Sequence, residues 1–240
     1  QDFLAAVIVG ADVGCRTSLA IGPTALYERG FHPSAVAGAL GAAATAGRLL
    51  GLSVEGMRRA FGLAGTQSSG LLAWETDPTE HSRPFNPGIA ARNGTTAALL
   101  ASLGFGGPPD IYFGKFNLFG AYAKEGGAPE RLTDGLGRDF AISAFAIKFY
   151  SCCAFLHPGL DALLQILEDE RLDATDIERI VLRFPTSGVK LIDDNPLKSH
   201  CGQYILPIAV LDRQIRVDDI LHDRRVDPRV ADLSRRTEVL

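Results

Sequence analysis

A run of alanine and glycine at residues 35–47 constrains the fold more than any other part of the chain. It follows Pro33 and Ser34, and proline is favoured in the first turn of a helix. A helix made from this run presents small side chains on nearly every face, so the backbones of neighbouring helices can approach it closely. We therefore expect a central helix with other helices around it.

The sequence on both sides of this run predicts more helices. Residues 2–19 have few polar side chains and suit a mostly buried helix. Ser53 is expected to begin another helix, and residues 87–103 form a third that Gly104 closes. Glycines mark the ends of these helices, and no strand patterns alternate with them. We therefore predict that the first part of the chain is all α-helical. A polar loop at residues 75–83 interrupts it, and such loops between core helices are often functional.

The composition of the chain changes near residue 140. Glycine-rich stretches at residues 126–129 and 134–137 precede this point. After it, strand-like patterns are mixed with helix-like ones. Strands are expected at 144–150 and 177–184, and helices at 156–170, 203–211 and 227–236. The predicted fold class is therefore mainly α with a smaller α+β part. Residues 1–140 would be part of an all-helical domain, and residues 141–240 an α+β domain that is incomplete at its C-terminal end.

Composition excludes several classes of protein. The chain has 240 residues, of which 46% are hydrophobic and 22% charged, as in an ordinary soluble globular protein. A net charge of −4 provides no basic field to hold nucleic acid. The apolar start is broken by Asp12, and no signal peptide pattern is present, so we expect no membrane partner. The chain begins at Gln1 rather than Met, and we expect it to be a segment of a longer protein.

The cysteines and the missing motifs indicate chemistry without a cofactor. The four cysteines form no Cys-x-x-Cys pair and have no zinc-like spacing with histidine, which favours free thiols in a reducing cytoplasm. The sequence contains neither a glycine-rich nucleotide loop nor a Gly-x-Ser-x-Gly nucleophile elbow. We therefore expect neither a metal nor an organic cofactor.

Residues 147–158 bring a lysine, a cysteine pair and a histidine together where a strand pattern changes to a helix pattern. Lys148 is either a surface lysine on an edge strand or a pocket lysine that binds a carboxylate. Cys153 lies near a helix start, which favours a thiolate, although most cysteines in apolar surroundings are packing residues. His157 is more typical of an ordinary helix-start residue than of a base.

Three further side chains are candidates for a site that binds an anion. His32 precedes the small-residue helix, and it either faces an anion at the helix start or is an ordinary loop histidine. Arg83, in the polar loop, suits bidentate carboxylate binding or is simply exposed. Tyr204 either donates a hydrogen bond to a substrate or packs. Together with Lys148, these residues suggest a cationic pocket for a small polycarboxylic acid.

The order and spacing of several runs resemble the MmgE/PrpD family, which includes 2-methylcitrate dehydratases and cis-aconitate decarboxylases. The resemblance covers nearly the whole chain. The runs are Gly30-Phe31-His32-Pro33-Ser34 and residues 39–44, 48–52, 87–91, 103–108 and 148–161.

This resemblance implies a large all-helical domain, a smaller α+β lid domain, a homodimer and no cofactor. It also implies that His32 lines the pocket, and that Arg83 and Lys148 stand at the positions of two family lysines. Cys153 falls where the decarboxylases have a histidine, and Tyr204 falls on a pocket tyrosine. Asn86 stands where a histidine is usual. An upstream Asp/Thr/His segment of the family is not in this chain, so the segment is expected to be catalytically incomplete by itself.

The resemblance and the residues together predict a cofactor-independent lyase acting on a small di- or tricarboxylic acid. The reaction would be a dehydration, as in 2-methylcitrate dehydratase, or a decarboxylation, and it would begin with removal of the α proton. His32 and Lys148 are the expected catalytic residues. The expected substrate-binding residues are Arg83, Asn86, Cys153 and Tyr204. Two alternatives stay open: an epimerase or isomerase of a dicarboxylic acid, and a catalytically incomplete homologue that binds carboxylates.

Overall fold

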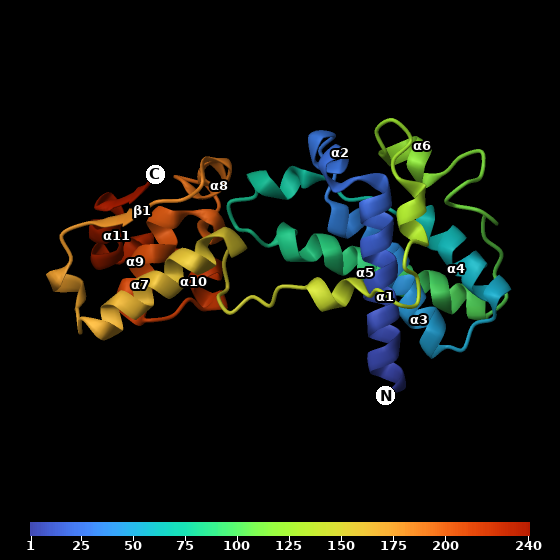
Figure 1. The fold of residues 1–240 in the computed structure, drawn as a ribbon, viewed down its shortest axis with the longest axis horizontal. Coiled ribbons are helices and arrows are strands. Elements are labelled where there is room, and N and C mark those ends of the chain that lie inside the picture. Colours follow the sequence, from blue (N-terminus) through green and yellow to red (C-terminus); the bar gives the residue numbers. More distant parts are fainter. The chain divides into compact units, whose positions relative to one another are not determined.

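The computed structural model describes residues 1–240 and divides them into two compact units (Figure 1). Unit 1 consists of residues 1–74 and 82–145, and unit 2 of residues 75–81 and 146–240. The predicted fold class is confirmed, because helices build unit 1 and the two paired strands lie in unit 2. The boundary that we place between residues 140 and 141 stays a prediction. The sequence did not lead us to expect residues 75–81 in unit 2.

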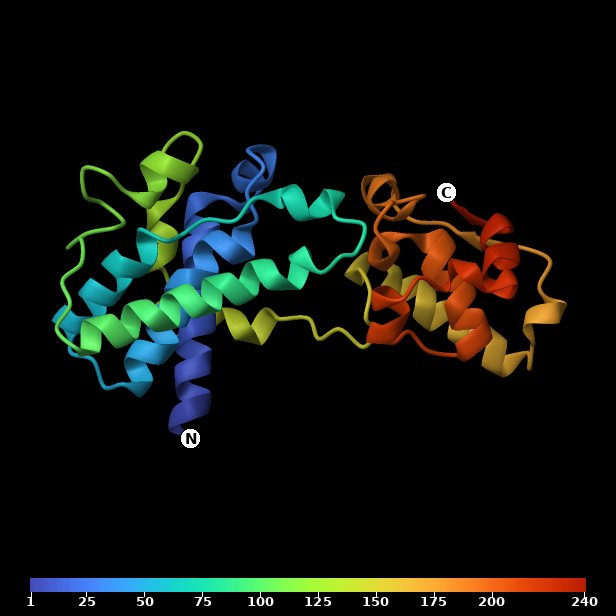
Figure 2. The same ribbon diagram turned by 180° about the vertical axis from the view of Figure 1, so that it is seen from behind.

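Unit 1 is a bundle of helices around α3 (Pro33–Leu49). Val36 and Leu40 of α3 are fully buried, as expected for a central helix. Figure 2 shows the long α5 beside α3. The other helices of unit 1 are α1 (Asp2–Ile21), α2 (Pro23–Glu28), α4 (Val54–Gly65), α5 (Ser82–Ser102) and α6 (Leu118–Tyr122).

Glycines allow α1 and α5 to approach α3 at backbone distance. A Cβ atom on Gly10 of α1 would lie 2.6 Å from the carbonyl oxygen of Gly41. On α5, a Cβ atom on Gly94 would lie 2.1 Å from the carbonyl oxygen of Ala39. Both distances are too short for a real side chain, so these crossings require glycine. The small-residue run therefore acts as the sequence predicts, as the surface on which neighbouring helices pack.

Helix α1 is apolar but has a buried polar pair. By length and composition alone α1 qualifies as a possible membrane span, which is weak evidence because buried core helices qualify as well. Asp12 and Arg16 form a buried ion pair, with 2.6 Å between Oδ2 and Nε. The expectation of a mostly buried helix is wrong for the first turn, where Phe3 and Leu4 are 63% and 65% exposed.

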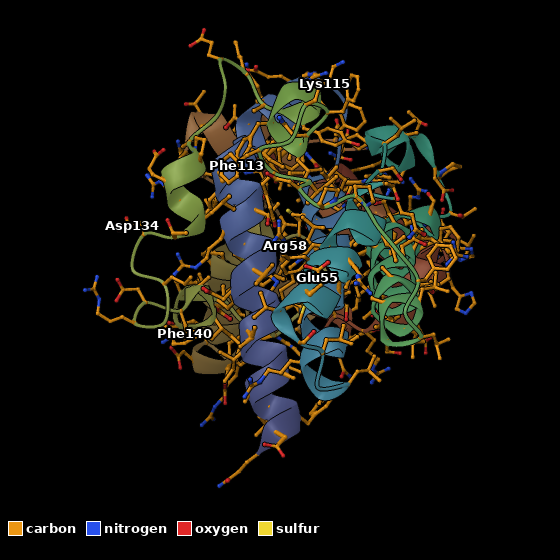
Figure 3. The ribbon with its side chains drawn as sticks, turned by 90° about the vertical axis from the view of Figure 1, so that its right-hand side faces the viewer. Glu55, Arg58, Phe113, Lys115, Asp134 and Phe140 are labelled. Atoms are coloured by element: carbon orange, nitrogen blue, oxygen red, sulfur yellow. The ribbon has the colours of Figure 1, made fainter.

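Arg16 also fixes the segment that follows α6. Its guanidinium donates to the carbonyl oxygens of Asp134 (2.5 Å) and Asp139 (2.7 Å). Asp12 accepts from the backbone N–H of Ala141 at 2.9 Å. Figure 3 shows Asp134 and Phe140 on the loops beside α1. The polar pair of α1 is thus satisfied by protein atoms, as buried charges require.

Helix α5 begins five residues earlier than predicted. The sequence pattern predicts a helix start at Pro87, but the helix starts at Ser82 and Pro87 lies inside it. Proline has no N–H to donate to the carbonyl of the residue four positions earlier, so it resembles a helix start in sequence. Here the carbonyl that loses this bond belongs to Arg83. The correction places Arg83 and Asn86 on the first turns of a helix rather than in a loop.

Unit 2 packs its helices around α9 (Gly202–Asp212), which is buried along most of its length. The helices predicted at 156–170, 203–211 and 227–236 are confirmed, with ends that differ by a few residues. The strand predicted at 177–184 is shorter than expected, and its partner β2 was not predicted. The elements are α7 (His157–Asp169), β1 (Ile180–Leu182), α8 (Thr186–Ile192), α10 (Val217–Leu221), α11 (Pro228–Arg235) and β2 (Thr237–Val239), with β1 and β2 parallel.

The strand predicted at residues 144–150 is wrong. The sheet contains only β1 and β2, so this segment has no strand to pair with. Its alternating apolar side chains are exposed instead, by 51% at Phe145, 78% at Ile147 and 84% at Phe149. An alternating pattern specifies a strand only when a neighbouring strand and a core face are available.

Candidate functional site

Three of the residues predicted from sequence come together around Trp74 in unit 1. His32 is the N-cap residue of α3, and its ring centroid lies 5.4 Å from that of Trp74. The guanidinium carbon of Arg83 lies 5.0 Å from the centroid of the Trp74 ring, a cation–π distance. Asn86 follows one turn later on α5. We call His32, Trp74, Arg83 and Asn86 the Trp74 site.

The backbone at residues 70–72 connects the helices that bear these side chains. The N–H of His32 donates to the carbonyl oxygen of Gly70 at 2.9 Å. The side-chain amide of Asn86 donates to the carbonyl oxygen of Leu71 at 3.2 Å. Gly70 has a φ of +138°, and a Cβ atom there would lie 2.3 Å from the Cβ of Ala35. Glycine is therefore required where the segment passes the start of α3.

A cavity of about 510 Å³ adjoins the Trp74 site, and Gly70, Trp74, Phe85, Asn86 and Asn93 are among the residues that line it. This volume lies within the range typical of small-molecule sites. The indole N–H of Trp74 and the Oδ1 atom of Asn86 are buried and have no hydrogen-bond partner. Leaving such a group unpaired costs about 1–3 kcal/mol, so one buried donor and one buried acceptor beside a cavity favour a ligand site.

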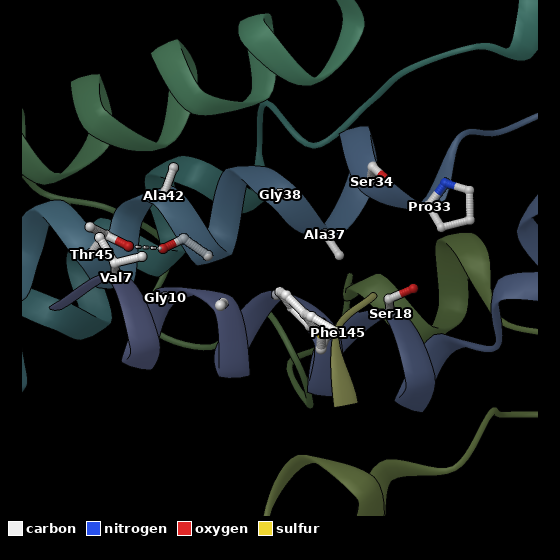
Figure 4. A pocket seen from close by; sticks show the side chains of 14 residues that line it. Val7, Gly10, Ser18, Pro33, Ser34, Ala37, Gly38, Ala42, Thr45 and Phe145 are labelled. Atoms are coloured by element: carbon white, nitrogen blue, oxygen red, sulfur yellow. Dashed lines mark hydrogen bonds between the residues drawn. The ribbon is translucent and has the colours of Figure 1, made fainter. Parts of the chain in front are cut away.

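A second cavity in unit 1 lies between α1 and α3, with a volume of about 430 Å³ (Figure 4). Its walls are mainly glycine and alanine, including Gly10, Ala37 and Gly41, and Phe145 lies at one side. None of the residues that line it is a predicted site residue. The sequence therefore gives no reason to place the carboxylic acid there.

In unit 2, Lys148 and Cys153 lie close together in the chain but in different surroundings. Lys148 is exposed in an irregular segment, and its ammonium group donates to the carbonyl oxygen of Cys152 at 3.0 Å. Cys153 is buried, and its N–H donates to the carbonyl oxygen of Ser199 at 2.7 Å. Burial, followed by the neighbouring Cys153, raises the pKa of Cys152 to about 12, although Lys148 opposes this effect. The Cys152 thiol therefore stays protonated near neutral pH.

Next to Cys153 lies a buried polar cluster that sequence reasoning did not assemble. We call Glu80, Lys198, Ser199 and His200 the Glu80 cluster. The Glu80 carboxylate accepts from both the N–H (3.1 Å) and the hydroxyl of Ser199. It also forms an ion pair with Lys198, at 4.0 Å. The hydroxyl of Ser199 lies 3.0 Å from Nδ1 of His200. These contacts join residues 75–81 to the rest of unit 2.

Comparison with known proteins shows which family this chain belongs to. Residues 1–130 match the MmgE/PrpD N-terminal domain, and residues 150–240 match the MmgE/PrpD C-terminal domain. The chain belongs to the MmgE/PrpD family.

Relatives of this MmgE/PrpD chain include curated cis-aconitate decarboxylases. The enzyme from Aspergillus terreus is 30% identical over 256 residues, which are 98% of this chain and 52% of that protein. The Mus musculus protein is 30% identical over 257 residues, covering 99% of this chain and 50% of its own length. The Homo sapiens protein is 28% identical over 251 residues, with coverage of 99% and 50%. The chain thus spans about half the length of the curated relatives it matches.

Two of the residues singled out from the sequence are held by contacts with other residues of unit 2 in this MmgE/PrpD chain. Tyr204 is 2% exposed, and its hydroxyl donates to the carbonyl oxygen of Asp219 at 2.5 Å and accepts from the N–H of Arg224 at 2.9 Å. These bonds fix the position of the Tyr204 ring, and its role in substrate binding stays a prediction. His157 is the first residue of α7, and its ring packs edge-on against Tyr150, with 5.1 Å between centroids.

Of the residues that sequence reasoning missed, Glu80 had no usable signal. It lies in a polar loop among other charged residues, and its hydrogen-bond partner Ser199 follows 119 residues later. Ser199 and His200 belong to a polar run that precedes Tyr204 at the start of α9. No group of three or more His, Cys, Asp or Glu side chains in this MmgE/PrpD chain is placed to hold a metal ion.

Proposed function

We propose that this chain is part of a lyase that acts on a small di- or tricarboxylic acid. Its curated relatives are named cis-aconitate decarboxylases, which supports this class of reaction and substrate. The single observation that carries the proposal is the Trp74 site: Trp74 and Asn86 line a cavity of about 510 Å³, and His32 and Arg83 contact Trp74. An amide at the cavity, with a proton-transfer group and a permanent cation around the Trp74 ring, suits a carboxylic acid.

In this proposal Arg83 binds a carboxylate of the substrate. The planar guanidinium offers parallel N–H groups that match the two oxygens of a carboxylate. The cation–π contact with Trp74 restrains the guanidinium, so less conformational entropy is lost when the acid binds. Because arginine stays protonated, Arg83 supplies charge and does not transfer a proton. Asn86 and Cys153 are proposed to contact the bound acid, as the family resemblance implies.

His32 is proposed to transfer the proton, and Lys148 to act as a second cation. In a dehydration, a base takes the proton α to a carboxylate and an acid protonates the leaving hydroxyl. In a decarboxylation, the bond to one carboxylate breaks, and the carbon that keeps the electron pair takes up a proton. Both routes place negative charge next to a carboxylate, and positive side chains stabilise that charge. Imidazole suits either proton transfer near neutral pH.

Proton NMR in deuterated water tests the activity. The whole lyase of which this chain is proposed to be part is incubated separately with cis-aconitate, citrate and 2-methylcitrate. Consumption of one acid with loss of carbon dioxide or water is the expected result, and the product separates decarboxylation from dehydration. Deuterium uptake without either loss would instead indicate an epimerase or isomerase. A rise in melting temperature without consumption would indicate a binding homologue. We also propose a homodimer, which sedimentation equilibrium tests.

The Arg83→Met variant tests the Trp74 site directly. It keeps most of the side-chain volume but removes the charge, and we expect kcat/KM to fall about 100- to 1000-fold, the usual cost of one oxyanion donor. Arg92→Met is the matched control, because Arg92 lies on the same helix and is exposed. It should keep full activity. Equal melting temperatures would exclude unfolding, and a loss of less than about twofold in Arg83→Met would refute the role.

A further inference from the structure

The Glu80 cluster contains a chain of three side chains, running from Glu80 through Ser199 to His200. The carboxylate and the lysine beside it are almost completely buried, with side-chain exposures of 3% for Glu80 and 6% for Lys198. Ser199 is 5% exposed, whereas His200 at the end of the chain is only partly buried. Inside unit 2, a buried carboxylate is therefore linked through one hydroxyl to a histidine that reaches toward the surface.

Hydrogen-bond polarity fixes the direction of this chain. At Glu80 the backbone N–H of Ser199 donates to the carboxylate, and the ammonium group of Lys198 forms an ion pair with it at 4.0 Å, as suits an ionised carboxylate. Such a carboxylate only accepts, so the hydroxyl of Ser199 gives its one proton to Glu80. That hydroxyl oxygen then has only lone pairs left for Nδ1 of His200, 3.0 Å away. Nδ1 must therefore carry a hydrogen, which in a neutral imidazole leaves the lone pair on Nε2.

We propose that Glu80, acting through Ser199, holds His200 in the Nδ1–H tautomer, so that His200 presents Nε2 as a proton acceptor. Glu80 and Ser199 are then positioning residues, and His200 is the base that takes the α proton, which leaves the other proton transfer of the reaction to His32. The same turn holds a proposed substrate-binding residue, because the carbonyl oxygen of Ser199 accepts from the N–H of Cys153 at 2.7 Å.

The role of His200 as a base rests on the proposed function, whereas its tautomer does not. As the base, Nε2 takes the proton from the carbon α to a carboxylate. The electron pair of the broken C–H bond passes into the enediolate, and the imidazolium that forms keeps its Nδ1–H bond to Ser199. The charge on Glu80 favours that cation through the intervening hydroxyl, so one arrangement orients the ring and supports its charged form.

Nitrogen-15 NMR of ring-labelled histidine reads the tautomer directly. The spectrum is recorded at a pH well above the ordinary imidazole pKa, and the His200→Gln variant assigns the His200 resonances. We expect protonated Nδ1 and unprotonated Nε2 in the unaltered protein. In Glu80→Gln the new amide donates to Ser199, so the hydroxyl turns toward His200 and the hydrogen moves to Nε2. Ser199→Ala removes the link and should also end the preference for Nδ1–H.

Glu75→Gln is the matched control, because Glu75 lies in the same short segment of unit 2 but is exposed. It removes the same charge and should leave the His200 signals unchanged. The proposal is overturned if His200 carries its hydrogen on Nε2 in the unaltered protein. It is also overturned if Nδ1–H persists in both Glu80→Gln and Ser199→Ala.

Activity provides a second reading that separates this proposal from the proposed function. If one of the acids is converted, Glu80→Gln should lower kcat about 100-fold, the usual contribution of a general base, with KM nearly unchanged. An unchanged kcat together with a switched tautomer would refute the role of His200 as a base. If no acid is converted, the proposed function fails, and the NMR result still decides the tautomer. Circular dichroism spectra and melting temperatures confirm that the variants are folded.

Discussion

At the scale of single residues, the strongest contrast in the molecule is between buried and exposed charge. Arg16 and Asp12 are paired inside unit 1, with side-chain exposures of 10% and 5%, and Arg16 also bonds to backbone carbonyls. Arg59 and Glu55 have the same i,i+4 spacing on α4, but their exposures are 39% and 61%. Removing one partner of a buried pair leaves an uncompensated charge, whereas an exposed charge is simply hydrated.

We therefore expect Arg16→Met to lower the free energy of unfolding by about 3–5 kcal/mol. Arg59→Met should change it by less than about 1 kcal/mol. Urea denaturation of both variants measures the difference. If the two variants lose similar stability, the pair in α1 does not hold residues 134–141 in the way its hydrogen bonds indicate.

The pKa of Cys152 makes stability depend on pH in the alkaline range. Burial raises this pKa from 9.0 to about 12 in the folded protein. Between these two values the unfolded chain has lost a proton that the folded protein keeps, so the free energy of unfolding falls as pH rises. Cys152→Ala removes this contribution, so its free energy of unfolding should fall less steeply as pH rises. Urea denaturation at several pH values above 9 tests this, and equal slopes in the two proteins would contradict the raised pKa.

At the scale of elements, α1 and α3 cross so closely that glycine is required at the crossing, although alanine has the higher helix propensity. Alanine is preferred to glycine inside a helix by about 1 kcal/mol. At Gly10, however, a Cβ atom would lie 1.8 Å from the hydroxyl of Thr45 and 2.6 Å from the carbonyl oxygen of Gly41. At Gly14, one turn later, the nearest atom would lie at an ordinary 3.7 Å. Gly10 therefore has no room for a Cβ atom, whereas Gly14 has.

Gly10→Ala should destabilise unit 1 by about 1–3 kcal/mol, since overpacking costs that much in a well-packed core. Gly14→Ala should instead be neutral or stabilising by up to about 1 kcal/mol. Thermal unfolding compares the two variants at the same protein concentration. A higher melting temperature for Gly10→Ala would show that α1 and α3 can move apart to make room for a Cβ atom without a loss of stability.

The elements also show which features of the fold and the site could be predicted from sequence. Helices α3 and α4 were predicted because Pro33 and Ser53 mark their starts, and both signals are local. Pro87 misled the prediction of α5 because an internal proline looks like a helix start. The segment at 144–150 misled because alternation does not reveal whether a partner strand exists. His32, Arg83 and Asn86 came from motifs, whereas Glu80 depends on contacts 119 residues away, which no local pattern reports.

At the scale of the whole molecule, the chain is divided into two units, and the segment around residue 145 passes from one to the other. Phe145 and Phe149 are exposed there and lie outside any helix or strand. We expect limited chymotrypsin digestion to cut first at these residues, because proteases prefer exposed, irregular backbone. Mass spectrometry identifies the first cut. A first cut inside α3 or α9 would contradict the division, because both helices are buried within their units.

The position of Glu80 in unit 2 has a consequence for synthesis on the ribosome. Ser199 is made 119 residues after Glu80, a delay on the order of ten seconds at ordinary rates of translation. Until then the carboxylate has neither of its later partners, and residues 75–81 emerge among residues of unit 1. Unit 2 therefore cannot complete its polar core while its own first segment is being made. A nascent chain arrested before residue 199 would expose that segment to proteases and chaperones.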